Sequence, residues 1–188
     1  IRALASSDAL NTLSGHRRQS LWAVAPHVQQ HDLMRHALVK EALPVIPSGP
    51  EGKEILADYH STGLTLRRHP LALLRPKLTR MNLRSAVELD SCPPGRLVRT
   101  TGIVTCRQRP GSANGVMFVT LEDETGIINV ILWNPIILKQ RREALGSRLL
   151  TVHGIWQSES GVKHVIAKRL VDHSRLLGSL AVDSRNFV

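Results

Sequence analysis

The sequence predicts an α+β protein in which a helical N-terminal segment and a connector with short helices precede a five-stranded β-barrel. Apolar residues recur at helical spacing over residues 1–43, which we interpret as a helical segment. Proline and glycine cluster at the start of residues 44–95, which indicates a connector. After Pro93-Pro94-Gly95, apolar and polar residues alternate as in strands, so we assign the barrel to residues 96–175 and a C-terminal tail to residues 176–188.

The composition is that of a globular, basic protein. The chain has 188 residues, of which 42% are hydrophobic, a composition that argues against intrinsic disorder. No apolar run reaches the roughly 18 residues that a membrane span needs, and two cysteines cannot form a disulfide framework. We therefore expect no membrane partner and a cytoplasmic protein. The net charge of +10 favours a nucleic-acid partner, and the alternative is an acidic protein.

The helical segment contains signals for three helices. Ser7 or Asp8 is a candidate N-cap for a first helix that Ser14-Gly15 ends. In the connector, residues 44–52 are expected to be irregular, and a short apolar segment is expected to end before Pro76. The second and third helices are predicted from His16 to Val24 and from Gln30 to Leu43, and a connector helix from Lys53 to Gly63.

Five strands and one helix are predicted after the connector. Gly102 is expected at a bend or bulge in the first strand, and Pro135 occupies a tolerated first-turn position of the helix. The predicted strands cover residues 97–104, 116–122, 127–133, 148–156 and 162–172, and the helix covers 134–146. This order is that of an OB-fold barrel, which binds oligonucleotides on its second and third strands. Architecture alone does not settle function.

Strand alternation selects three candidate nucleic-acid-binding residues. If Val119 and Leu121 point into the barrel, Phe118 and Thr120 point outward. In the next strand, Asn129 points outward when Ile128, Val130 and Leu132 fill the inside. Phe118 could then stack on a base and Asn129 could bind a base edge. The alternative is a bulge that reverses the register and buries Phe118.

Arginines are candidates for phosphate contacts, because the guanidinium fork is bidentate and always charged. Arg107 and Arg109 are placed in the loop after the first strand, and the alternative is that both are solvated loop charges. Six other basic residues are interpreted as solvated faces: Lys139, Arg141, Arg142, Lys163, Lys168 and Arg169.

Metal and catalytic motifs are weak in this chain. His27 and His31 have one-turn spacing and His36 is near, but no fourth ligand completes a zinc site. Cys92 and Cys106 form no CxxC pair, and a phosphate-cradling Gly-x-x-x-x-Gly-Lys loop is missing. We therefore expect no metal, no cofactor and no catalytic residue in this chain.

Several segments together resemble one family. Asp8-Ala9-Leu10, residues 15–19 and Leu21-Trp22 look like the end of the helix-hairpin-helix region of bacterial error-prone DNA polymerases, which are C-family relatives of the polymerase III alpha subunit. The resemblance is densest at residues 102–111 and 118–126. It also includes residues 58–71, 140–142 and 184–187. Asn134-Pro135 departs from the pattern, because proline is expected directly after Trp133.

The resemblance implies a C-terminal DNA-binding module of an error-prone, translesion polymerase that acts in damage-induced mutagenesis and repair synthesis. The parent chain would be a DNA-directed DNA polymerase, a nucleotidyltransferase whose magnesium and catalytic carboxylates lie upstream. The implied partners are single-stranded or template DNA and mutagenesis accessory proteins, with the sliding clamp as a further candidate. Residues 19–22 are a loose match to a clamp-binding peptide, but helix packing explains them better. Arg17 and Arg18 are further candidates for DNA contact.

Two other functions remain open. In the first, the chain is a protein-interaction module that docks the polymerase onto mutagenesis accessory factors. In the second, it is an anticodon-binding domain of a tRNA synthetase, a family that shares the barrel. Arg17-Arg18 and the connector residues 67–71 argue against the second alternative.

Overall fold

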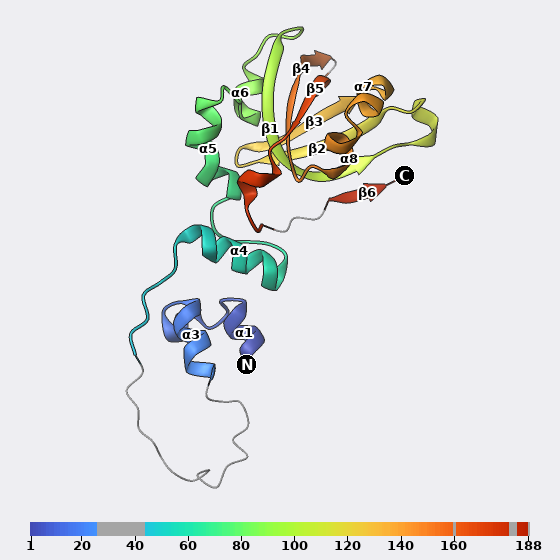
Figure 1. Ribbon diagram of the computed structural model, residues 1–188. Coiled ribbons are helices and arrows are strands. Elements are labelled where there is room, and N and C mark those ends of the chain that lie inside the picture. Colours follow the sequence, from blue (N-terminus) through green and yellow to red (C-terminus); the bar gives the residue numbers. More distant parts are fainter. Residues whose placement is uncertain (26–43, 160, 181–183, 188) are drawn as a thin grey trace, which may run out of the picture. The chain divides into compact units, whose positions relative to one another are not determined.

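The computed structural model describes residues 1–25, 44–159, 161–180 and 184–187. The chain forms two compact units, residues 1–66 and 67–188, which we describe separately (Figure 1). The division falls inside the predicted connector. The predicted helix from Gln30 to Leu43, together with His27, His31 and His36, lies outside the described residues.

The first unit contains four described helices: α1 (Arg2–Ser6), α2 (Asn11–Ser14), α3 (Arg17–Val24) and α4 (Glu51–Thr62). Helix α3 confirms the predicted second helix, and its N-cap His16 accepts a hydrogen bond from the Gln19 N–H through Nδ1. The predicted cap at Ser7 or Asp8 is wrong. Asp8 has φ 62° in the turn after α1, and α2 begins later, without a side-chain cap.

Glycine positions in the first unit agree only in part with the prediction. Gly15 has φ 86° and ends α2, and Gly63 has φ 76° and ends α4, as expected of residues that adopt positive φ without strain. Gly52 was expected in an irregular stretch but lies in the first turn of α4, after Pro50 at the N-cap. Helix α4 can begin before the predicted Lys53 because the backbone N–H groups of a helix's first turn have no partner within the helix, so Pro50, which lacks an N–H, is tolerated at the N-cap.

The second unit is a closed barrel, which confirms the predicted OB architecture. Its strands are β1 (Leu97–Gln108), β2 (Met117–Asp123), β3 (Gly126–Leu132), β4 (Leu149–Glu159) and β5 (Val162–Asp172). They pair in the order β1-β2-β3-β5-β4, and β4 pairs with β1 to close the barrel. A short strand β6 (Arg185–Phe187), not predicted, runs parallel to the end of β1.

Strand β1 is longer than predicted because it pairs with two neighbouring strands, β4 and β2. Its first half pairs with β4 and its second half with β2, and the register shifts between Val104 and Cys106. The bulge therefore lies after Gly102, not at it. A Cβ on Gly102 would lie 2.7 Å from the Leu121 Cβ, so this glycine permits the close approach of β2.

The predicted helix after β3 is two helices, α7 (Asn134–Lys139) and α8 (Arg141–Gly146). They meet at Gln140, whose backbone is not helical (φ −124°, ψ 47°). The Gln140 amide donates to the Leu170 carbonyl at 2.8 Å and accepts from the Leu170 N–H at 2.8 Å. This double hydrogen bond to β5 holds Gln140 out of the helical conformation. Two 3₁₀ turns complete this part, η2 (Gly111–Ala113) and η3 (Ser174–Leu177).

Helices α5 (Pro70–Arg80) and α6 (Ala86–Asp90) precede the barrel and lie along one side of it (Figure 1). The apolar segment was expected to end before Pro76, but α5 continues through this proline. Leu71 and Leu78 are fully buried on either side of it, and their burial offsets the hydrogen bond that Pro76 cannot donate. Helix α6 begins with a capping box formed by Ser85 and Glu88.

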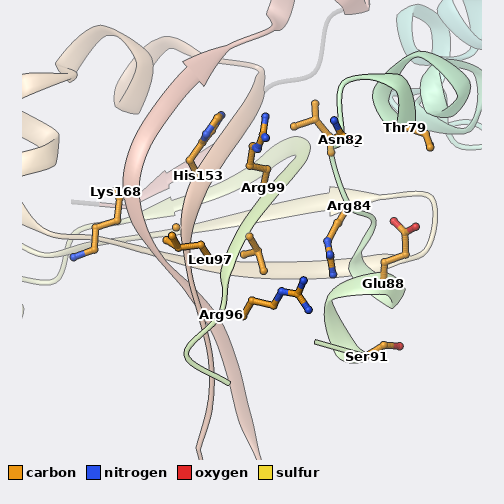
Figure 2. A pocket seen from close by; sticks show the side chains of 13 residues that line it. Thr79, Asn82, Arg84, Glu88, Ser91, Arg96, Leu97, Arg99, His153 and Lys168 are labelled. Carbon is orange, nitrogen blue, oxygen red and sulfur yellow. The ribbon is translucent and has the colours of Figure 1, made fainter. Parts of the chain in front are cut away.

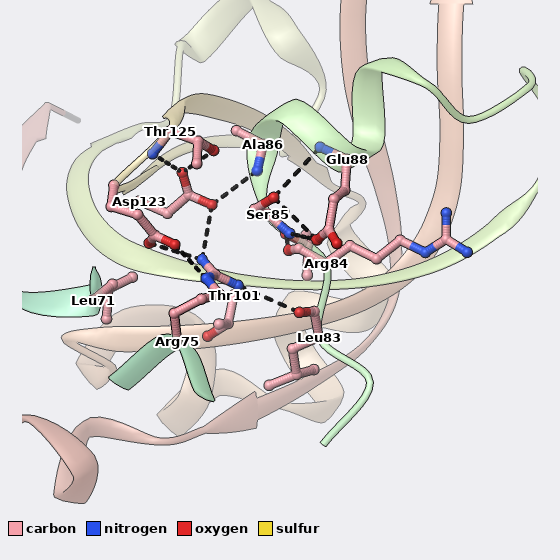
Figure 3. A network of polar contacts seen from close by, with 12 residues as sticks. Leu71, Arg75, Leu83, Arg84, Ser85, Ala86, Glu88, Thr101, Asp123 and Thr125 are labelled. Carbon is pink, nitrogen blue, oxygen red and sulfur yellow. Dashed lines mark hydrogen bonds and ion pairs between the residues drawn. The ribbon is translucent and has the colours of Figure 1, made fainter. Parts of the chain in front are cut away.

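A polar network joins α5 and α6 to the turn between β2 and β3 (Figure 3). Asp123 is buried, and its carboxylate accepts from Arg75 at 3.2 Å and from the Ala86 N–H at 2.8 Å. Its other oxygen accepts from the backbone of Thr125 and Gly126. Arg75 also donates to Glu124, and this hydrogen bond raises the pKa of the guanidinium. The network fixes residues 70–90 to the barrel.

Candidate nucleic-acid interface

The predicted alternation of β2 and β3 is confirmed. Val119 and Leu121 are buried, whereas Phe118, which precedes them in β2, is 40% exposed. In β3, Ile128, Val130 and Leu132 are buried and Asn129 is exposed. The alternative register, which would bury Phe118 in the core, is therefore excluded.

Cross-strand pairing places the outward residues of three strands in rows. Thr120 lies opposite Asn129 of β3 and opposite Cys106 of β1. Phe118 lies opposite Ile131 of β3 and opposite Gln108 of β1. Residues paired in this way project to the same side of a sheet, so the two rows form one surface.

Strand β6 extends both rows with residues that the sequence did not single out as candidates. Phe187 lies opposite Gln108, and Arg185 lies opposite Cys106. Both side chains are exposed. A three-residue strand is too short to show a period of two, so no local signal identifies it. We call this surface the aromatic face; it consists of Phe187, Gln108, Phe118, Ile131, Arg185, Cys106, Thr120 and Asn129.

Arg109 lies at the edge of the aromatic face. It is exposed and follows β1, as predicted, and its backbone N–H donates to the Phe187 carbonyl at 3.0 Å. The loop that follows β1 therefore begins beside β6. An Arg side chain at this position can reach a phosphate of a strand that lies on the aromatic face.

Arg107 lies in strand β1 and not in the loop where it was predicted. Only 6% of its surface is exposed, and burial lowers the pKa of its guanidinium. The guanidinium donates to the Ala144 carbonyl at 2.9 Å, to the Ser147 carbonyl, and to Ser184 Oγ at 2.5 Å. These bonds direct it into the protein, where it ties α8 and the residue before β6 to β1. The bulge between Val104 and Cys106 reverses the alternation of β1 and so turns Arg107 inward. The residue types around Arg107, which predicted a loop, do not reveal this bulge.

Arg17 and Arg18 belong to the first unit, whereas the other candidates belong to the second. Arg17 is buried, donates to the Glu54 carbonyl at 2.9 Å and forms ion pairs with Glu54 and Asp58. Arg18 is exposed and donates to the Pro47 carbonyl at 2.9 Å. Arg17 therefore holds α3 against α4.

Within residues 1–25, 44–159, 161–180 and 184–187, no group of three His, Cys, Asp or Glu side chains is placed to hold a metal ion. In the same described part of the chain, no helix has the length and apolar character of a membrane span.

The fold and the aromatic face define the class of the second unit. Residues 95–172 match the family described as OB-fold nucleic acid binding domain. The whole chain is 52% identical over 191 residues to the error-prone DNA polymerase of Bordetella parapertussis, and 50% identical over 193 residues to that of Ralstonia pickettii. The alignments cover 98% and 100% of this chain and 18% of each relative.

These alignments confirm the resemblance inferred from the sequence. The chain is homologous to one segment of the error-prone DNA polymerases and spans 18% of the length of the relatives it matches. A solved asparaginyl-tRNA synthetase from Pyrococcus horikoshii aligns with 42% of this chain and 20% of its own at 22% identity, with a TM-score of 0.34.

Proposed function

We propose that the second unit binds single-stranded DNA for an error-prone DNA polymerase and that the aromatic face is the binding surface. The observation that carries this proposal is the placement of Phe118 and Phe187 opposite the same residue, Gln108, on the exposed side of an OB barrel. Exposed aromatic rings that are grouped on one face indicate a binding surface. Bases of an unpaired strand provide such a cover, because each base has a π-face.

Each group on the aromatic face has a role in this proposal. The rings of Phe118 and Phe187 stack on bases, at about 1–3 kcal/mol per base. Thr120 and Asn129 offer a hydroxyl and an amide within one row, and both can bind base edges. Arg109 and Arg185 lie beside the rings and bind phosphates, which positions the strand without reading its sequence.

The activity of the longer protein is part of the same proposal. The names of the relatives support a DNA-directed DNA polymerase as the parent chain. We propose that this segment holds template DNA during damage-induced, translesion and repair synthesis in the cytoplasm, and that upstream carboxylates with magnesium perform nucleotide transfer. We include mutagenesis accessory proteins among the partners of the longer chain. The loose clamp-binding match at residues 19–22 lies in α3 with Ser20 buried, which does not favour a sliding-clamp contact there.

Fluorescence anisotropy with a labelled single-stranded oligonucleotide tests the proposal. The wild-type chain should bind at low salt, and Phe118→Ala and Phe187→Ala should each weaken binding by about 1–3 kcal/mol. Leu138→Ala is the matched control, because Leu138 is 67% exposed on α7 and lies outside the aromatic face. Affinity should remain unchanged in that control.

The alternative is a protein-interaction module. Val87, Ile127 and Val162 are 57%, 66% and 62% exposed around a groove between α6 and β3, and exposed apolar residues of this kind suit a protein partner. If the wild-type chain shows no binding to the oligonucleotide at low salt, the DNA proposal is wrong and docking onto accessory factors is favoured.

A further inference from the structure

A second surface of the barrel is strongly basic. A groove of about 920 Å³ lies between the outer side of β1 and β4 and the segment from Thr79 to Ser91 (Figure 2). It uses the first half of β1, whereas the aromatic face uses the second half. The two surfaces share no residue. We call this surface the basic groove; its basic lining residues are Arg84, Arg96, Arg99, His153 and Lys168.

The strands bring three basic residues into one row. Arg99 of β1 lies opposite His153 of β4, and His153 lies opposite Arg169 of β5. Burial, Arg99 and Arg169 together lower the pKa of His153. The lowered pKa keeps the His153 imidazole neutral near pH 7, so Arg99 and Arg169 flank a neutral residue and supply the positive charge of this row. Lys168 and Arg169, interpreted from the sequence as solvated charges, therefore lie in or beside a shared basic surface.

Two more guanidinium groups border the groove, that of Arg84 from the segment between Thr79 and Ser91 and that of Arg96 from the residue before β1. In Figure 2 the side chains of Arg84 and Arg96 extend from the two walls toward the same space. Arg84 Nη1 donates to Cys92 Sγ. Arg96 and Arg99 are exposed. Arginine forks from different elements thus converge on one groove.

The groove holds little negative charge to neutralise these cations. Among the described residues that line it, Glu88 is the one acid. Its carboxylate accepts from the Ser85 N–H at 2.7 Å and from the Ser85 hydroxyl at 3.0 Å, so it serves the capping box of α6. These hydrogen bonds to Ser85 lower the pKa of Glu88. The positive charge of the groove therefore suits an anion from outside the chain.

We propose that the basic groove binds the phosphodiester backbone of nucleic acid at a site separate from the aromatic face. The described lining contains no Phe, Trp or Tyr and is rich in arginine, so it suits phosphates better than stacked bases. Three arginines provide the planar donors that phosphate oxygens accept. The choice of nucleic acid over an acidic peptide rests on the proposed function. The groove belongs to the same barrel as the aromatic face, so a DNA strand bound there would lie near the groove.

The salt dependence of binding tests the groove. Replacing Arg96 and Arg99 together by Gln removes two exposed cations and should preserve the fold. The slope of log K against log salt for a single-stranded oligonucleotide should become less negative by about 1.4, since each lost phosphate contact contributes about 0.7. The matched control is Arg141→Gln with Arg142→Gln, two exposed arginines of α8 outside the groove. This control should leave the slope nearly unchanged.

An abasic oligonucleotide separates the groove from the aromatic face, because it keeps the phosphates and lacks the bases. Its binding should fall in the Arg96→Gln, Arg99→Gln chain and be unaffected by Phe118→Ala with Phe187→Ala. The groove proposal is overturned if the Arg96→Gln, Arg99→Gln chain binds ordinary DNA with the same salt slope as its α8 control. If the phenylalanine variants still weaken DNA binding in that case, the proposed function stands. If the wild-type chain binds neither the ordinary nor the abasic oligonucleotide, both the groove proposal and the proposed function are overturned.

Competition with poly-glutamate distinguishes an acidic protein partner. If poly-glutamate of matched charge binds more tightly than the abasic oligonucleotide, and the groove variant abolishes that difference, the groove belongs to an acidic partner and our assignment is wrong. Tighter binding of the abasic oligonucleotide, lost in the groove variant, supports the phosphodiester assignment.

Discussion

Phe118 and Phe187 lie on either side of Gln108 on one face of the barrel. They are the only two phenylalanines in the chain, and they come from strands β2 and β6. Strand β6 pairs with β1 over three residues, so the position of Phe187 depends on what holds this short strand. The buried Arg107, which binds Ser184 just before β6, is such a support.

Arg107→Ala should destabilise the second unit. The substitution leaves the carbonyls of Ala144 and Ser147 without their donor, and we expect a loss of about 2–4 kcal/mol in the free energy of unfolding. Urea unfolding measures this loss. Arg109→Ala is the control, because Arg109 is exposed and should change stability by less than about 0.5 kcal/mol. An Arg107→Ala chain as stable as the wild type would show that the guanidinium does not brace the barrel.

Asp123→Asn should release residues 70–90 from the barrel. The buried carboxylate accepts the N–H groups of Ala86, Thr125 and Gly126, so an amide donor in place of one oxygen leaves a buried N–H or the Arg75 guanidinium without its acceptor, at about 1–3 kcal/mol, although Arg75 keeps its pair with Glu124. Hydrogen exchange should become faster in α5 and α6. Asp90→Asn, which breaks the exposed pair with Lys163, should cost about 1 kcal/mol or less. Unchanged exchange in α5 and α6 would contradict the role of Asp123.

Gly154→Ala should strongly destabilise the barrel. A Cβ at this position would lie 2.3 Å from the Ile166 carbonyl oxygen and 2.7 Å from Val165 Cγ1, and both neighbours belong to β5. Strand β5 cannot move away without losing its pairing with β4, so a loss of about 3 kcal/mol or more is expected. Gly146→Ala is the matched control. No atom lies within 4 Å of that Cβ, and Ala at this end of α8 should be neutral or slightly stabilising in thermal melts.

The second unit should lose stability as the pH falls from 7.5 to 5.5. Burial lowers the pKa of His69 from its ordinary value of 6.5, although Glu122, Glu124 and Asp123 oppose this change. The unfolded chain therefore binds a proton at a higher pH than the folded chain. The stability is complete above about 6.5 and decreases below it. Protonation also removes the Nδ1 acceptor that caps α5 at the Leu71 N–H.

His69→Asn tests this pH dependence, because Asn is a good N-cap that does not titrate. Urea unfolding at both pH values should show a smaller difference for His69→Asn than for the wild type. Part of the difference should remain, since burial also lowers the pKa values of His153 and His173. An equal pH effect in His69→Asn and wild type would assign the dependence to other groups.

Local patterns in the sequence were enough to identify the barrel and the central part of the aromatic face. The strands from Met117 to Asp123 and from Gly126 to Leu132 alternate with a period of two, and a turn joins them. This period alone decides which side chains leave the core, so Phe118, Thr120 and Asn129 could be placed outside. The helix at Arg17–Val24 and the breaks at Gly15 and Gly63 likewise follow from local residue preferences.

Contacts between distant residues decided the rest. Arg107 is buried because a bulge in β1 brings it beside Ala144 and Ser147, and Gln140 interrupts a helix because it binds Leu170 of β5. The alignment of Phe187 with Phe118, and that of Arg99 with His153 and Arg169, exists only when the strands pair. A local pattern reports the direction of each side chain within its own element. Only the packed barrel determines which elements become neighbours, because that choice depends on burial and pairing across the whole unit.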